Sequence, residues 1–152
     1  MPGKIETLLQ DLESNIPFYA KQNLNVSSSN IGWHIEHCFL TFDGIIKRLS
    51  QTNSKDYKWK FSLPRMFVFA TGKIPKGRAK APERVQPRGA IDQESLTHHL
   101  SKTKDKIKEL RTMDAQQFFE HPYFGHLKLK DTIRFLEIHT KHHLKIIEGI
   151  KA

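Results

Sequence analysis

The sequence lacks the features that define several protein classes. Its single cysteine among 152 residues, Cys38, excludes an internal disulfide framework and is typical of a reducing compartment. No apolar run approaches the roughly 18 residues of a membrane-spanning helix, and the first residues lack the apolar stretch of a secretion signal. Glycine and proline are too few for a collagen-like or low-complexity chain. We therefore expect a single cytoplasmic domain over residues 1–152 with no membrane partner.

Basic residues and histidines are what the chain has in excess. Lysine and arginine number 25 against 16 acidic residues, which gives a net charge of +9, and there are nine histidines. The excess is partly local, because residues 65–88 hold seven basic residues and one acidic residue, Glu83. Such a balance indicates an anionic partner: nucleic acid, a membrane surface or an acidic substrate.

Apolar residues recur at helical spacing in four long segments. The predicted long helices cover about 5–19, 31–49, 92–110 and 129–150, and a short apolar helix is predicted over 63–70. Pro17 is expected either to kink the first helix or to divide it. Asn30 and Asp92 are suited to capping the second and third long helices. We expect almost no strand, and a turn-rich link where the last long helix is approached.

Four long helices with one long connection predict an all-α fold, a four-helix bundle. The connection, about 51–91, joins the second and third long helices as a long basic crossover. Long loops within compact domains are often functional. We therefore expect residues 73–88 to lie over the open end of the bundle, with Arg78, Lys80 and Arg84 favouring an anionic substrate.

The histidine pattern indicates a metal site. His139 and His143 are four residues apart, which places both imidazoles on one face of the last helix. A third nitrogen could come from His34 or His37 on the second long helix, and periodicity does not decide between them. Three neutral imidazoles suit Zn, Ni, Fe or Cu and leave coordination positions open. No general base is evident, since Glu36 is expected to point elsewhere.

The remaining candidates have less specific interpretations. Cys38 is more typical of a buried core residue than of a nucleophile. His98 and His99 are expected on the surface of the third long helix. His121 and His126 flank a turn, and one of them could reach a metal pocket.

Three segments carry a resemblance to a known family: NIGWHIEH (30–37), HPYFGHL (121–127) and FLEIHTKHH (135–143). Together they resemble the DinB-like (YfiT-type) metalloenzymes, in the branch with an HPxFG turn before the last helix. The resemblance implies a four-helix bundle of the up-up-down-down type. It also implies a homodimer.

The resemblance further implies a divalent metal ion, Zn or Ni first, bound by His37, His139 and His143. His34 and His142 would then lie outside the ligand set. The chain departs from the family in its long basic crossover and in the residues Leu144-Lys145-Ile146 after the histidine pair.

A three-histidine metal ion can lower the pKa of a bound water or stabilise a thiolate. We therefore expect a metal-dependent enzyme, a hydrolase or a thiol transferase, acting on a small molecule that is anionic or a thiol. Two alternatives are a non-catalytic metal-binding protein and a protein that binds acidic partners through its basic segment. Nucleic acid is not expected, because no nucleic-acid-binding module is recognisable.

Overall fold

The structure is a computed structural model that describes residues 3–75 and 81–152. Arg78 and Lys80, which the sequence predicted to bind an anion, lie outside the described residues. The long helices are α1 (Lys4–Asn15), α2 (Ile31–Gln51), α4 (Gln93–Glu109) and α5 (Leu129–Lys151). The smaller elements are α3 (Leu63–Thr71), strands β1 (Phe118–His121) and β2 (Gly125–Lys128), and the 3-10 turns η1 (Ile16–Phe18), η2 (Ser54–Asp56), η3 (Glu83–Val85) and η4 (Leu110–Thr112).

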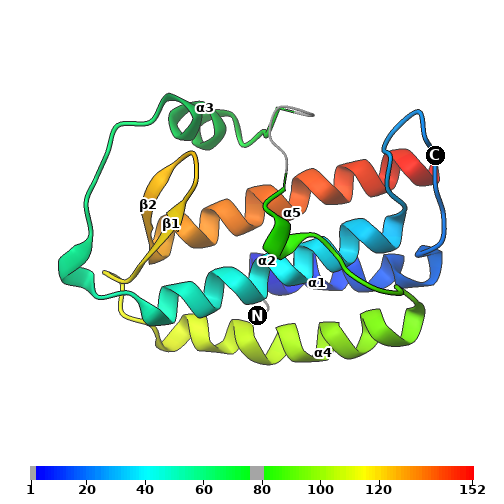
Figure 1. The fold of residues 1–152 in the computed structure, drawn as a ribbon, viewed down its shortest axis with the longest axis horizontal. Coiled ribbons are helices and arrows are strands. Elements are labelled where there is room, and N and C mark those ends of the chain that lie inside the picture. Colours follow the sequence, from blue (N-terminus) through cyan, green and yellow to red (C-terminus); the bar gives the residue numbers. More distant parts are fainter. Residues whose placement is uncertain (1–2, 76–80) are drawn as a thin grey trace.

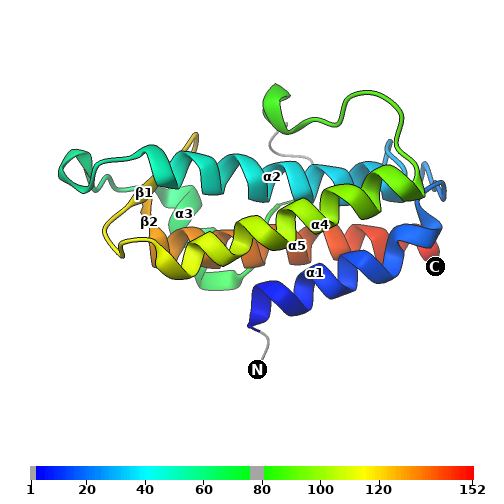
Figure 2. The same cartoon turned by 90° about the horizontal axis from the view of Figure 1, so that it is seen from below.

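The four long helices lie side by side around one apolar core (Figures 1 and 2). α1 contacts α4 and α5, and α2 contacts the same two helices. Each helix contributes fully buried side chains, including Leu12, Phe39, Leu96 and Leu136. The fold is therefore mostly helical, as the periodicity predicted. In the described residues, none of the helices is long and apolar enough to cross a membrane.

The expected up-up-down-down order of the helices is wrong. α1 and α5 run in one direction and α2 and α4 in the opposite one (Figure 1), so the order is up-down-down-up. Side-chain pairs agree, since Glu6 meets Arg111 and Glu13 meets Lys104, which makes α1 and α4 antiparallel. The physical reason is connection length. Short links reverse the chain after α1 and after α4, whereas the long crossover allows α4 to run parallel to α2.

Local chemistry fixes the beginnings of the helices that carry the site. The Asn30 side chain accepts a hydrogen bond from the Trp33 backbone N–H at 2.9 Å and caps α2, as predicted. Asp92 caps α4 in a reciprocal pair with Ser95. α5 has no side-chain cap at Lys128. It begins where β2 ends, so the strand sets its start.

The predicted turn-rich link before α5 is a β-hairpin. β1 pairs antiparallel with β2, with Phe118 opposite Lys128 and His121 opposite Gly125. The His121 ring closes the turn, because its Nδ1 accepts the backbone N–H groups of Tyr123 and Phe124 at 3.0 and 3.1 Å. Strands of four residues are too short for alternation to be recognised in the sequence.

Of the two outcomes predicted at Pro17, a kink or a division of the first helix, the structure shows the division. The first helix ends at Asn15, and Pro17 follows within η1. Proline lacks the N–H that would continue the helical hydrogen bonds.

Candidate metal centre

Three histidines converge between α2 and α5. Nitrogen atoms of His37, His139 and His143 all lie within 4.8 Å of one another. His37 and His143 are buried, and His139 is half-buried. His139 and His143 share one face of α5 because they are four residues apart, and α2 runs antiparallel along that face. The site is therefore built on two helices rather than on loops.

The crossover orients the ring of His37. The Nδ1–H of His37 donates to the backbone carbonyl of Val85, in η3, at 2.8 Å. A neutral imidazole carries one proton, so Nε2 of His37 is an acceptor and takes a hydrogen bond from His139. That atom lies 3.1 Å from Nε2 of His139. The Val85 carbonyl therefore aims one donor atom of His37 at the centre of the cluster.

A second hydrogen-bonded chain orients the ring of His143. Nδ1 of His143 lies 2.9 Å from Nδ1 of His34, and Nε2 of His34 lies 2.9 Å from the Ser27 hydroxyl. The backbone N–H of Ser29 donates to the same hydroxyl at 3.1 Å. If His143 presents Nε2 to the cluster, its Nδ1–H donates to His34, and His34 donates in turn to Ser27. This chain leaves one tautomer for each ring.

His139 differs from the other two histidines. Among the described residues, its Nδ1 is the buried side-chain nitrogen that has no hydrogen-bond partner. A buried polar atom without a partner costs about 1–3 kcal/mol. The other nitrogen of this ring, Nε2, faces His37. A group bound at Nε2 would therefore place the ring proton on the unpaired Nδ1.

The cluster is electrically neutral near neutral pH. Burial lowers the pKa of all three imidazoles, most strongly for His139 and His143. In His37 the Val85 hydrogen bond opposes this effect, and in His139 and His143 the neighbouring histidines add to it. A neutral imidazole is the form that binds a metal ion.

The donor set fits a divalent transition metal. Two nitrogens bound at about 2.0–2.1 Å to a tetrahedral ion lie about 3.4 Å apart, and the Nε2 atoms of His37 and His139 are 3.1 Å apart. Three nitrogen donors without a carboxylate suit Zn or Ni better than Mg or Ca. The three residues could therefore hold such an ion with small adjustments of the rings.

The other sequence candidates lie elsewhere. His34 is hydrogen-bonded to His143, and the residue of α2 that lies in the three-histidine cluster is His37. Cys38 is fully buried in the core, and burial raises the pKa of its thiol. His121 closes the hairpin turn. His126 stacks on Phe118 at 4.4 Å between ring centroids. Neither residue joins the cluster.

The expected surface position of His99 is wrong. Its ring lies half-buried between α4 and α2, where Nδ1 contacts the Glu36 carboxylate and Nε2 lies 2.6 Å from the Asp43 carboxylate. Thr103 donates to the other oxygen of Asp43 at 2.9 Å. Burial lowers the pKa of His99, but the hydrogen bonds to Asp43 and Glu36 outweigh it and raise that pKa to about 9. His99 is therefore a cation that joins the two helices.

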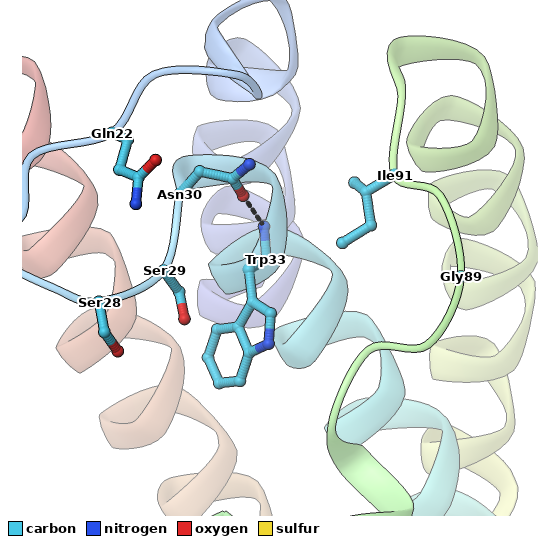
Figure 3. Close-up of a pocket in the computed structure, with 7 residues that line it drawn as sticks. All are labelled: Gln22, Ser28, Ser29, Asn30, Trp33, Gly89 and Ile91. Atoms are coloured by element: carbon cyan, nitrogen blue, oxygen red, sulfur yellow. Dashed lines mark hydrogen bonds between the residues drawn. The ribbon is translucent and has the colours of Figure 1, made fainter.

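A solvent-open pocket lies beside the cluster. The Trp33 indole stacks on the His37 ring at 5.1 Å between centroids. Trp33 also lines a pocket of about 380 Å³. Figure 3 shows this indole between Ser28 and Ser29 on one side and the Gly89–Ile91 segment on the other. The lining is polar and carries no charged side chain. A small molecule in this pocket would lie against the residue that covers His37.

Part of the basic segment lies against the site. η3 contacts α2, and its Val85 carbonyl is the partner of His37. Arg84, next to Val85, lines a second shallow pocket with Pro82, Glu83 and Arg88. The described part of the segment therefore reaches the histidines.

Two contributors had no signal in the sequence. A backbone carbonyl such as that of Val85 has no residue-type signature, and Ser27 is one of three consecutive serines. A search for a hydroxyl near His34 would have found Ser27 only with the loop geometry known.

The comparisons with known proteins give one family. The model of the DinB superfamily matches residues 6–147. Neither the curated proteins nor the solved structures include a match to this sequence.

Proposed function

The chain belongs to the DinB superfamily, and from that premise we propose that it binds a divalent metal ion through His37, His139 and His143. The observation that carries the proposal is the convergence of three neutral imidazoles, two buried and one half-buried, within 4.8 Å. Within the proposal the ion is Zn or Ni, two of the metals that nitrogen donors suit.

The protein's own residues hold the ligands in place. The Val85 carbonyl keeps the His37 proton on Nδ1, and His34 accepts the proton of His143 when His143 coordinates through Nε2. The ion would supply Lewis acidity to a substrate oxygen or sulfur. Trp33 stacks on one face of the His37 ring.

The proposed activity is metal-dependent hydrolysis or thiol transfer on a small molecule. The polar pocket next to Trp33 offers the hydroxyls of Ser28 and Ser29 and the side-chain amide of Gln22 to such a substrate. Arg84 and Arg88 lie in the neighbouring segment and favour an anionic group on it. We further propose that the protein belongs to the YfiT-type branch, whose HPxFG turn corresponds to the hairpin turn at residues 121–125. The proposal also includes a cytoplasmic location and a homodimer.

The test starts from protein purified without a nickel column. We expect about one equivalent of Zn or Ni by elemental analysis, and its loss in His139→Ala. The same samples are then assayed against a panel of esters and of thiols with electrophiles, before and after removal of the metal with a chelator. Activity that disappears with the metal and returns on its addition supports the enzyme.

The outcomes separate the parts of the proposal. Wild-type protein that holds no Zn or Ni, even after incubation with either ion, overturns the metal site. Bound metal without activity towards either class of substrate overturns the enzymatic part and favours a non-catalytic metal-binding protein.

A further inference from the structure

Helix α3 presents three of its large apolar side chains to solvent. Leu63, Met66 and Phe67 follow the helical spacing i, i+3, i+4 and are 68%, 53% and 53% exposed. The opposite side of the helix is buried through Arg65 and Val68. A surface helix normally turns its apolar stripe inward, so this orientation requires a reason.

Neighbouring segments extend the apolar surface. Trp59 and Phe61 precede α3, Tyr123 lies at the hairpin turn, and all three are more than half exposed. We call these six residues the α3 patch: Trp59, Phe61, Leu63, Met66, Phe67 and Tyr123. Among the described residues, eight large apolar side chains are exposed, and six belong to this patch. Such a concentration marks an interaction site.

The patch is held in place by hydrogen bonds to the hairpin. The Ser62 hydroxyl donates to the Tyr123 carbonyl at 2.9 Å, and the buried Arg65 guanidinium donates to the Phe124 carbonyl at 3.0 Å. The same guanidinium lies 5.3 Å from the Trp59 ring centroid. The backbone that carries the exposed side chains is therefore fixed to the hairpin.

Basic residues predominate in the segment that carries most of the patch, whereas Asp56 before it and Glu120 of β1 are exposed acidic residues. Residues 57–75 contain four basic residues and no acidic one. Lys58, Lys60 and Lys73 are exposed, and Arg134 of α5 binds the Phe69 carbonyl of α3 at 2.5 Å. An apolar patch bordered by basic residues complements a partner that has an apolar interior and an anionic surface.

We propose that the α3 patch binds the surface of a bilayer that contains anionic phospholipids. The aliphatic and phenyl side chains enter the boundary of the acyl chains, where Trp59 and Tyr123 also find their preferred environment. The lysines meet lipid phosphates, each contributing about 1 kcal/mol near such a surface. The expectation of no membrane partner rested on the absence of a spanning segment, which peripheral binding does not need.

A second copy of the chain fits this surface less well. A symmetric contact through the α3 patch brings the lysines of one copy against those of the other, and like charges oppose association. An anionic bilayer neutralises the same charges. The charge pattern therefore favours lipid over self-association.

The experiment uses the full chain and vesicles of two compositions. The first is phosphatidylcholine alone, and the second is phosphatidylcholine and phosphatidylglycerol in equal parts. We expect co-sedimentation with the second composition at low salt, with weaker binding at high salt. The emission of Trp59 should move to shorter wavelength on binding, and Trp59→Phe should lose that change while Trp33 remains.

Matched variants test the two kinds of contact. The triple variant Phe61→Gln, Leu63→Gln, Phe67→Gln should abolish binding. The control Leu24→Gln replaces an exposed apolar residue outside the patch and should leave binding unchanged. Lys58→Gln with Lys60→Gln should weaken binding by about 30-fold. The control Lys102→Gln with Lys108→Gln removes the same charge from exposed positions on α4 and should have a smaller effect.

The melting temperature of each variant checks that it is folded. Vesicle binding that is equal in the wild type and in the folded triple variant overturns the proposal, as does a lack of binding to the anionic vesicles. A dimer in light scattering that the triple variant converts to a monomer, without vesicle binding by either form, assigns the patch to self-association and also overturns it. Since the patch shares no residue with the histidine cluster, these outcomes leave the metal proposal independent.

Discussion

A cluster of three histidines and the single histidine His99, with its carboxylate partners, lie on opposite sides of α2 and take different charge states. Glu36 and His37 are consecutive, yet Glu36 contacts His99 on α4 while His37 meets His139 on α5. His99 has two carboxylate partners, and its pKa is raised to about 9. The cluster of His37 has imidazoles and a backbone carbonyl as partners, and its pKa values are lowered.

The comparison teaches that carboxylate neighbours can reverse the effect of burial on the charge of a histidine. Both groups are largely shielded from water. Carboxylates hold a proton on His99 and make it half of an ion pair. Without them, the other rings stay neutral and keep lone pairs for a metal ion. The predictions below test this division.

The largest expected effect is the loss of metal in His139→Ala. The substitution removes one of three donor nitrogens. Loss of a residue that only hydrogen-bonds a ligand lowers metal affinity by up to about 100-fold, so loss of the ligand itself should lower it further. Competition with a chromophoric chelator measures the affinity. His98→Ala, on the exposed face of α4, is the control. Unchanged affinity in a folded His139→Ala protein would mean that the cluster is not the metal site.

Metal should stabilise the protein near neutral pH and lose that effect in acid, below the ordinary imidazole pKa of about 6.5. Binding to the folded state adds about 2.7 kcal/mol at a hundredfold excess of metal over Kd. Protonation competes with the metal for the imidazoles, although the lowered pKa values delay it to more acidic pH. The apo protein should remain folded on its own core. Thermal melts with and without chelator, from about pH 7.5 to about pH 5, measure the gap. Equal melts at the higher pH, in protein that contains metal, would contradict a site within the helices.

Much of the site could be predicted because its signals are local. The spacing of His139 and His143 and the cap at Asn30 each depend on residues within one helix, and the helices are where the periodicity predicted them. The choice between His34 and His37 is different. Both are buried side chains of α2. Only the positions of α5 and η3 determine which of the two rings joins His139 and His143.

The features that the sequence could not give depend on neighbours in space. The hairpin at β1 and β2 is too short to show a period, and the helix order follows from where the crossover leads the chain. His98 and His99 look alike in sequence, but the turn of α4 exposes one and brings the other to Asp43. The partner, rather than the residue type, made the difference.

The chain behind His143 gives the next effect. His34→Gln removes an imidazole that accepts the His143 proton, and we expect metal affinity to fall by about 10- to 100-fold with the stoichiometry unchanged. Ser27→Ala should have a smaller effect, since it acts through His34. Chelator competition measures both variants, and melts of the apo proteins control for lost packing. A His34→Gln protein with wild-type affinity would show that His143 needs no oriented proton.

The smallest effect concerns the charged cluster and depends on pH in the opposite sense. The pKa of His99 is raised in the folded protein, so its stabilising contribution is fully present below the unfolded value of about 6.5 and is lost as pH rises through about 9. Glu36 and Asp43 face the ring from α2, and Lys106 lies 3.7 Å from the Asp43 carboxylate and shares it. His99→Gln should cost on the order of 2 kcal/mol at about pH 6 and much less at about pH 9.5. Urea unfolding at both pH values measures the difference, with His98→Gln as the matched control. A cost that is the same at both pH values would show that His99 joins the helices by packing on Phe39, at 5.3 Å between ring centroids, and not by its charge.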